Sequence, residues 1–387
     1  MKLIENTPDL ISFCQELHQQ PYIAVDLEFL REKTYYAKLC LIQVATPNTA
    51  AIIDPLAPEI ELDAFFSVLH NPDIIKIFHS GRQDIEIIYH LAGFIPEPLF
   101  DTQIAAQVFG FGEAVSYENL VKTILGIQLD KSCRLSDWSL RPLDNKQLQY
   151  ALSDVTHLVH IYEHLRDQLN ESGRQHWLDE EFATLSDSET YIVHPENAWQ
   201  KIKHRSHNSR MLTVLRELAA WRERRAQNKD TPRQSIIRDE CLLNIAAACP
   251  NNQDELEKIR NIRKDVANGK LGTEILEVIS KFAQIPPSDY VKPEHEKLLP
   301  VSAGALYELL RLLLKIRAQE HNVIPRLIAS DDDLKRLAMF SDKKNPVLRG
   351  WRQEIFGKDA LALRQGRLNI SYNAEKRRIE ISEKAEN

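Results

Sequence analysis

Along residues 1–170, apolar positions recur with two periods: every second residue in short runs, and every three to four residues in longer ones. The first period predicts β-strands and the second predicts amphipathic helices. The predicted strands are 22–29, 39–45, 50–54 and 74–79, and the predicted helices are 11–19, 62–69, 84–91, 102–109, 117–125 and 147–169. Strands that alternate with helices predict an α/β domain over 1–170.

Downstream of residue 208 the pattern becomes helical throughout, and the proline-rich segment 284–300 divides it into two parts. The tripeptide Arg-Ala-Gln at 225–227 recurs at 317–319, which is 92 residues later. Such a repeat favours two related helical modules over one irregular helical domain. We therefore predict two all-α modules, at 208–288 and 295–375.

The segments outside these domains have no clear period. A connector at 171–207 contains aromatic residues among polar ones, so we expect it to pack on its neighbours. Residues 376–387 are mostly charged, and we predict a disordered tail there, because such a composition cannot bury enough apolar surface to fold.

The composition is that of a globular protein, with 43% hydrophobic and 27% charged residues in a chain of 387. Its five cysteines are scattered and form no C-x-x-C pair, which argues against a zinc site and a secreted disulfide framework. No apolar run approaches the ~18 residues of a membrane span, and the N-terminus lacks the apolar run of a signal peptide. We expect a cytoplasmic protein that does not bind membranes.

Charge divides the chain into two unlike halves. Residues 1–200 contain 13 Lys+Arg and 30 Asp+Glu, a net charge of −17, whereas residues 201–387 contain 36 and 26, a net charge of +10. The basic half could bind a polyanion by neutralising its phosphates. Two domains with unrelated surface charge would show the same asymmetry, so charge alone leaves both interpretations open.

Two carboxylates share one face of the strand predicted at 22–29. Side chains alternate between the faces of a strand, so Asp26 and Glu28 point the same way as Ala24. Like charges repel and burial without a partner is costly, but a divalent cation with hard oxygen ligands resolves both problems. The alternative is an edge strand with a solvated acidic face, and for a lone pair of this kind that alternative is the more common one.

Two further acids occupy helix positions. Asp154 follows Tyr150 by four residues on the helix predicted at 147–169, so the phenol and the carboxylate lie side by side. Asp84 follows a strand and Gly81, at the start of a helix. Each also has a purely structural explanation: a Tyr hydrogen-bonded to a surface Asp, and an acid that stabilises a helix N-terminus.

The order and spacing of these acids resemble the DEDD exonuclease superfamily. The four acids of that superfamily match Asp26, Glu28, Asp84 and Asp154. Tyr150 matches the tyrosine subclass, because the histidine subclass has a His where this chain has Gln149. Over its whole length the chain resembles the ribonuclease D family, on segments 22–46, 77–88, 98–106, 129–143 and 148–165. The two helical modules resemble HRDC domains, which are auxiliary nucleic-acid-binding bundles also found in RecQ helicases.

The resemblance implies a fold, a chemistry and a substrate. The fold would be an RNase H-like mixed sheet flanked by helices, followed by two HRDC domains. The four acids would bind two divalent ions, Mg²⁺ or Mn²⁺, with Asp26 between them, and Tyr150 and Glu28 would orient the attacking water. The enzyme would be a 3′–5′ exoribonuclease that releases 5′-mononucleotides from single-stranded 3′ ends of RNA, including precursor tRNA. We expect it to act as a monomer.

Five further residues are candidates for contacts with RNA. They are Arg134, Trp138 and Arg141 in a predicted loop, and Arg225 and Arg233 in the first helical module. The arginines could bind phosphates and the indole could stack on a base. A buried indole with salt-bridged neighbours, and a solvated helix face, explain the same residues equally well. Asp101 is predicted to be the N-cap of the helix at 102–109.

Two other functions share these features. A 3′–5′ exonuclease acting on DNA would carry the same acids, since nothing in the motif reads the 2′-hydroxyl. A non-catalytic binding scaffold could keep the fold, but all five chemical positions are intact, which argues against it. A helicase is disfavoured because the chain has no G-x-x-x-x-G-K-[ST] phosphate loop.

Overall fold

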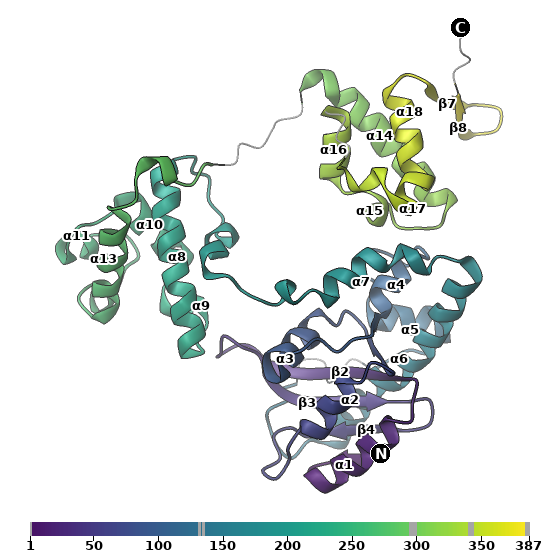
Figure 1. Cartoon of the computed structure of the whole chain (residues 1–387), viewed down its shortest axis with the longest axis horizontal. Coiled ribbons are helices and arrows are strands. Elements are labelled where there is room, and N and C mark those ends of the chain that lie inside the picture. The colour runs from purple at the N-terminus through teal and green to yellow at the C-terminus, as the bar shows by residue number, and fades with distance from the viewer. Residues whose placement is uncertain (1, 131–132, 134–135, 294–299, 340–343, 384–387) are drawn as a thin grey trace.

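A six-stranded mixed sheet forms the centre of the N-terminal domain in the computed structural model (Figure 1), which describes residues 2–130, 133, 136–293, 300–339 and 344–383. The strands lie in the order β1 (Lys2–Ile4), β4 (Ala50–Ile53), β3 (Lys38–Ala45), β2 (Tyr22–Leu30), β5 (Ile75–Phe78) and β6 (Leu99–Asp101). β3 runs antiparallel to both neighbours, and the other pairs are parallel. The mixed sheet flanked by helices is therefore confirmed.

Helices cover both faces of this sheet. The helices of this domain are α1 (Thr7–Leu17), α2 (Asp63–His70), α3 (Arg82–Ala92), α4 (Thr102–Gln107), α5 (Tyr117–Leu125) and α6 (Asn145–Ser172). α1, α2 and α3 pack on the face that carries Ile23, Val25 and Leu27. α6 packs on the opposite face, where its Val155 meets Ala24. The two faces of β2 thus separate as the alternation predicts, and the side that carries Asp26 and Glu28 faces α6.

Most predicted elements of this domain form within a few residues of their predicted ends. The predicted N-cap is also present, since the side chain of Asp101 caps α4. The side chain of Ser116 caps α5, and Gly126 ends that helix. The strands β1 and β6 were not predicted, because a three-residue strand is too short to show a period.

The first helical module has a hydrophobic core of its own. It comprises α8 (Ser209–Lys229), α9 (Arg233–Ile236), α10 (Asp239–Ala248), α11 (Gln253–Glu257), α12 (Lys264–Ala267) and α13 (Lys270–Phe282). Its core includes Leu215, Leu242 and Ile275, together with Ile202 of the connector. In Figure 1 this module lies to the left of the N-terminal domain.

The second helical module shares one continuous core with the N-terminal domain. It comprises α14 (Val301–Glu320), α15 (Pro325–Ile328), α16 (Asp331–Met339), α17 (Gly350–Arg352), a π-helical turn (Gln353–Gly357) and α18 (Lys358–Arg364). Its core joins that of α4, α5 and α6 in a single cluster. At the junction, Trp177 of the connector and Trp351 stack with ring centroids 4.4 Å apart.

Two predictions outside the domains need correction. The connector packs on its neighbours as expected, but it contains a helix, α7 (Asp179–Ser186), and three short 3₁₀ turns (Gln175–Trp177, Ser188–Thr190 and Pro195–Lys201). The tail predicted to be disordered contains a strand, β8 (Arg378–Glu383), paired with β7 (Leu368–Asn373). Ile381 faces Ile370 in this hairpin, and both pack against the second module. The alternation of Ile379 and Ile381 with polar residues is a strand pattern that the high charge of this segment obscured.

Among the described residues, no helix combines the length and apolar character needed to cross a membrane.

Candidate active site

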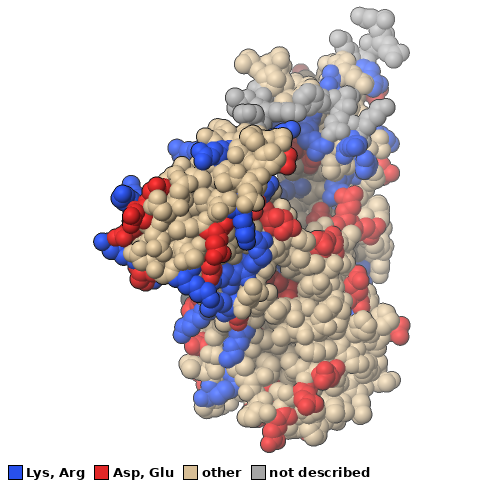
Figure 2. All heavy atoms as spheres, turned by 60° about the vertical axis from the view of Figure 1, so that its left-hand side comes forward, with Lys and Arg blue, Asp and Glu red and all other residues tan. Residues whose placement is uncertain are grey.

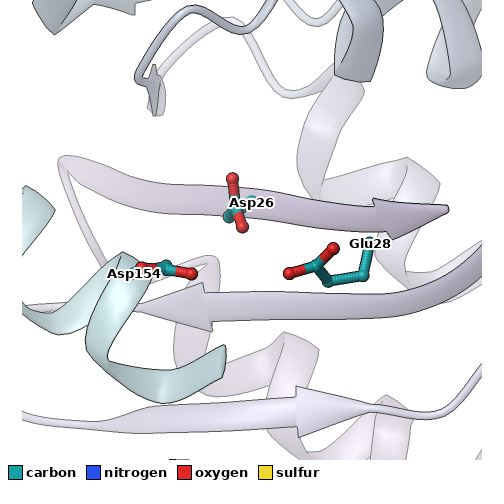
Figure 3. A group of neighbouring side chains, drawn as sticks. All are labelled: Asp26, Glu28 and Asp154. Carbon is teal, nitrogen blue, oxygen red and sulfur yellow. The ribbon is translucent and has the colours of Figure 1, made fainter. Parts of the chain in front are cut away.

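Three carboxylates converge at the centre of the N-terminal domain (Figure 3). Asp26 and Glu28 project from β2, and Asp154 projects from α6. One carboxylate oxygen of each lies within 4.8 Å of those of the other two. The register between β2 and β3 shifts between Glu28 and Phe29, so the strand is irregular directly beside the second acid. Residues far apart in sequence thus form one group, as the spacing of the motifs predicts.

Asp84 joins this group from a tightly constrained turn between β5 and α3. Ser80 adopts a positive φ of 58°, and Gly81 leaves no room for a side chain, because a Cβ there would lie 2.4 Å from the Cβ of Phe78. The carboxylate of Asp101 accepts hydrogen bonds from the backbone N–H groups of Ser80 (3.2 Å) and Gly81 (2.8 Å). The turn is therefore held in place by Asp101, and it positions the carboxylate of Asp84 in the first turn of α3.

Asp101 has two structural roles, of which only the N-cap of α4 was predicted from the sequence. Besides the two N–H groups of the turn, its side chain accepts hydrogen bonds from the N–H groups of Gln103 and Ile104, which is the predicted N-cap role. It is 2% exposed. The missed signal is an Asp at the end of a strand, where one carboxylate can reach both its own helix and the neighbouring turn.

Tyr150 lies beside Asp154 on α6 and shares a side-chain hydrogen bond with it. Its ring also packs against Trp138, with centroids 6.1 Å apart. Burial, followed by the charges of Asp154, Glu28 and Asp26, raises the pKa of Tyr150 above its usual value. The phenol therefore keeps its proton at neutral pH, and it can donate a hydrogen bond but cannot serve as a base.

The four acids repel one another in a poorly solvated place. Burial raises the pKa of Asp26 to about 7 and, together with the charge of Asp26, raises that of Asp154 to about 8. Burial and the charges of the other three acids raise the pKa of Glu28 to about 9. The pKa of Asp84 is raised well above its usual value, first by burial and then by the charge of Asp26. Such a group is stable as four anions only if cations compensate its charge.

These side chains line an open cleft of about 720 Å³. None of the described residues that line the cleft is Lys or Arg, so none of these residues supplies a compensating cation. Carboxylate oxygens that converge within a few ångströms are the donor set that Mg²⁺ or Mn²⁺ prefers. The residues present therefore fit a divalent metal centre. Tyr117, which sequence reasoning missed, also lines the cleft, and its hydroxyl donates to the backbone carbonyl of Ser153 (2.8 Å).

Two residues predicted to contact RNA have structural roles instead. Trp138 is 2% exposed, so neither face of its indole is open to a base. The guanidinium of Arg141 donates to both carboxylate oxygens of Asp54 (2.5 and 2.6 Å) and to the carbonyl oxygens of Trp138 and Cys40 (2.8 Å each). All its directional donors are engaged within the protein, so Arg141 fixes this loop on the sheet.

The two candidates in the first helical module differ in their surroundings. The guanidinium of Arg225 is paired with Glu274 (2.6 Å) and so links α8, the first helix of the module, to α13, the last. Its role as an RNA contact stays a prediction. Arg233 is paired with Glu223 (2.6 Å) and lies over the ring of Tyr35, but it also lines an open cavity. Arg134 lies outside the described residues.

Comparison with known proteins finds matches over both the N-terminal domain and the first helical module. Residues 1–170 match the family model described as 3′–5′ exonuclease, and residues 211–279 match the HRDC domain model. Ribonuclease D of Gluconacetobacter diazotrophicus is 44% identical over 371 residues, which cover 96% of this chain and 94% of that protein. Ribonuclease D of Zymomonas mobilis is 42% identical over 99% of this chain and 98% of its own length.

A solved structure shows the same architecture over nearly the whole length. The crystal structure of Escherichia coli RNase D, described as an exoribonuclease involved in structured RNA processing, superposes with a TM-score of 0.80. It is 28% identical in sequence, and the match covers 94% of this chain and 98% of that chain. The catalytic core of RRP6 from Trypanosoma brucei shares the fold at a TM-score of 0.56 and 24% identity. This chain therefore belongs to the ribonuclease D family, and it is a metal-dependent 3′–5′ exoribonuclease.

Proposed function

We propose that Asp26, Glu28, Asp84 and Asp154 bind two divalent ions, Mg²⁺ or Mn²⁺, and that Tyr150 orients the water that attacks the RNA. The observation that carries this proposal is the convergence of three carboxylates within 4.8 Å, with Asp84 on the wall of the same cleft. Asp26 is central, because its charge acts on Glu28, Asp84 and Asp154 alike. It is therefore the residue that we assign to both ions.

The bound ions would supply an activated water and would neutralise the charge that develops on the phosphate and the departing oxygen. Hydrolysis adds the water oxygen to the terminal phosphorus and breaks the bond between that phosphorus and the 3′ oxygen of the preceding nucleotide. The products are a 5′-mononucleotide and an RNA shortened by one residue with a free 3′-hydroxyl. Tyr150 keeps its proton and directs a hydrogen bond, so its role is to align the water rather than to deprotonate it.

We further propose that the substrates are single-stranded 3′ ends of cytoplasmic RNA, including the 3′ trailers of precursor tRNA, and that the enzyme acts as a monomer. The cleft is open to solvent, which suits a strand end that enters and is shortened stepwise. Cys14, Cys40 and Cys241 are buried free thiols, as expected in a reducing compartment.

The second helical module is, we propose, a second copy of the HRDC fold. Its helix α14 begins at Val301, which is 92 residues after Ser209, the start of α8. The next two helices keep the same offset, since α15 and α16 begin 92 residues after α9 and α10. The repeated arginine also keeps its role: Arg317 pairs with Asp359 of α18 (2.5 Å), as Arg225 pairs with a residue of the last helix of the first module.

A direct test uses one labelled single-stranded RNA and its DNA twin, each with and without Mg²⁺ or Mn²⁺. We expect stepwise loss of nucleotides from the 3′ end of the RNA, 5′-mononucleotide products, and no reaction with a chelator present. Asp154→Asn should abolish the reaction, whereas Asp73→Asn, which changes an exposed acid of the same domain, should not. Equal cleavage of the DNA, or activity in Asp154→Asn, would contradict the proposal. A precursor tRNA with a 3′ trailer then tests the substrate assignment.

A further inference from the structure

A second cavity lies beside the catalytic cleft, where the first helical module meets the N-terminal domain. It has a volume of about 660 Å³. Its walls come from the loop after β2, the start of α3, the connector, and helices α8 and α9. Gln83 lines both this cavity and the catalytic cleft. The two spaces therefore adjoin at the residue next to Asp84, and we refer to the second one as the junction cavity.

The junction cavity is preformed by a polar contact between the two domains. The carboxylate of Asp230, at the end of α8, accepts hydrogen bonds from the backbone N–H groups of Tyr35 and Tyr36 (2.9 Å each). The hydroxyl of Tyr35 donates to the buried carboxylate of Glu223, which also pairs with Arg233. These contacts fix the distance between the walls without filling the space between them.

Positive charge is in excess in this cavity. The basic residues that line it are Arg31, Arg82, Lys201, Arg222 and Arg233, and the acidic ones are Glu86, Glu223 and Asp239. Each of the three acids is already paired with a lining arginine, at 2.6 to 2.7 Å. Arg82 and Lys201 are exposed and form no ion pair with any described residue. Figure 2 shows Lys and Arg side chains gathered where the first helical module overhangs the N-terminal domain.

The chemistry of the lining favours phosphate over base. Tyr35 and Tyr191 are less than 10% exposed, so neither offers a ring face on which a base could stack. The other lining side chains are the five cations, the three acids that are each paired with an arginine, and neutral groups such as those of Gln83 and Gln234. Cations with neutral hydrogen-bonding partners bind a sugar-phosphate backbone without reading its sequence.

We propose that the junction cavity binds the backbone of the RNA strand on the 5′ side of the scissile phosphate, with Arg82 and Lys201 neutralising upstream phosphates. The proposal rests on the exoribonuclease activity. The terminal nucleotide occupies the catalytic cleft, so the rest of the strand must leave that cleft along its wall. At Gln83 this wall opens onto Arg82 and Lys201, which pair with no acid among the described residues. The acidic half of the chain would otherwise repel the strand.

The test compares Arg82→Gln/Lys201→Gln with the matched variant Lys122→Gln/Lys203→Gln, which removes two exposed cations of the N-terminal domain and the connector outside the cavity. The substrates are single-stranded RNAs that lengthen one nucleotide at a time from a dinucleotide, at saturating Mg²⁺. For the wild type, kcat/KM should rise with length until the strand fills the junction cavity. The cavity variant should lose about tenfold in kcat/KM on long RNAs, through KM, and much less on the dinucleotide.

Salt dependence provides a second readout. Removing two phosphate contacts should reduce the slope of log(kcat/KM) against log[salt] by about 1.4, at about 0.7 per phosphate for a single strand. The matched variant should keep the wild-type slope. Lys201→Gln alone changes no residue near Asp84. This variant should show a smaller loss of kcat/KM with the same dependence on RNA length.

Three results would overturn the proposal. The first result is that the wild type degrades RNA from its 3′ end and the cavity variant shows the same length profile and salt slope. This result would refute the inference about the junction cavity but would not contradict the exoribonuclease function. The second is an equal loss on the dinucleotide and on long RNAs, which would place the effect in the catalytic cleft. The third is binding of a free 5′-mononucleotide that the cavity variant abolishes without any change in the length profile, which would make the cavity a site for separate nucleotides.

Discussion

Replacing Asp26 by asparagine should make the metal-free protein more stable and the enzyme inactive. Burial raises the pKa of this carboxyl from 3.8 to about 7. Because the pKa in the folded state lies above that in the unfolded state, the ionised group opposes folding. The penalty is absent below about pH 4, grows as pH rises, and is complete above about pH 7. The neutral amide that the substitution introduces would carry no such penalty at any pH.

The size of the effect follows from the shift. Three pKa units correspond to about 4 kcal/mol at about 1.4 kcal/mol per unit, and water in the open cleft screens part of this, so we expect about 2 kcal/mol. For a domain of about 150 to 200 residues, that raises Tm by about 4–8 °C. Divalent ions close this gap, because saturation at about 100 times Kd stabilises the wild type by about 2.7 kcal/mol and the variant by less. Loss of several kcal/mol of charge stabilisation lowers kcat by about a thousandfold.

The assay is thermal unfolding of the wild type, Asp26→Asn and Asp73→Asn, from about pH 4 to about pH 8, with a chelator and with Mg²⁺. The gap between the wild type and Asp26→Asn should open as pH rises with the chelator and close with Mg²⁺. Asp73 is exposed, so Asp73→Asn should follow the wild type throughout. If Asp26→Asn is less stable than the wild type without metal, or gains as much from Mg²⁺, the four acids are not a mutually repelling metal site.

Three further outcomes can be measured on the same protein. Tyr150→Phe should lower kcat about tenfold to a hundredfold with little change in KM, because it removes only the hydroxyl that bonds Asp154 and keeps the ring packing; an effect confined to KM would contradict the water-orienting role. Asp101→Ala should cost about 3 kcal/mol of stability and raise the Mg²⁺ concentration for half-maximal activity, because four backbone N–H groups lose their acceptor. Asp101→Asn should restore part of the stability and part of the Mg²⁺ affinity. An unchanged Mg²⁺ requirement in Asp101→Ala would limit the role of this residue to capping α4. Trp351→Ala should lower the unfolding free energy of the N-terminal domain by about 3–5 kcal/mol, since its indole stacks on Trp177 within the shared core; if nuclease activity survives heating as in the wild type, the two units unfold separately.

The contacts within the candidate active site could be predicted where they depend on local geometry. Alternation along β2 fixes which side chains face α6, and the four-residue spacing on α6 fixes the contact of Tyr150 with Asp154. Only the contact between β2, α3 and α6 is long-range, and it was inferred from the resemblance of the motifs to a known superfamily. The strands of the sheet were predicted because alternation of apolar residues is also a local pattern. The exceptions are β1 and β6, which are only three residues long.

The RNA contacts could not be predicted in this way, because the partner of a cation depends on the tertiary fold. Arg141 meets Asp54, which lies 87 residues earlier, and Arg225 meets Glu274, which lies 49 residues later. No local pattern distinguishes these paired arginines from Arg82, which is left open to solvent and was not singled out from the sequence. Arg82 was thus missed although it lies two residues before Asp84, whereas Arg141 and Arg225 form ion pairs within the protein.

The 92-residue repeat extends to how each module attaches to the N-terminal domain. Asp230 and Asn322 occupy equivalent positions at the end of the first helix of each module, and both have a positive φ, of 45° and 50°. Each side chain contacts the N-terminal domain, but with opposite polarity: the carboxylate of Asp230 accepts from backbone N–H groups, whereas the amide of Asn322 donates to the carbonyl oxygen of Phe109 (3.2 Å). An ionised carboxylate has no proton to donate to that carbonyl, so Asn322→Asp would lose this hydrogen bond. The side chain at this repeated turn therefore differs between the two modules in the way that the surface it contacts requires.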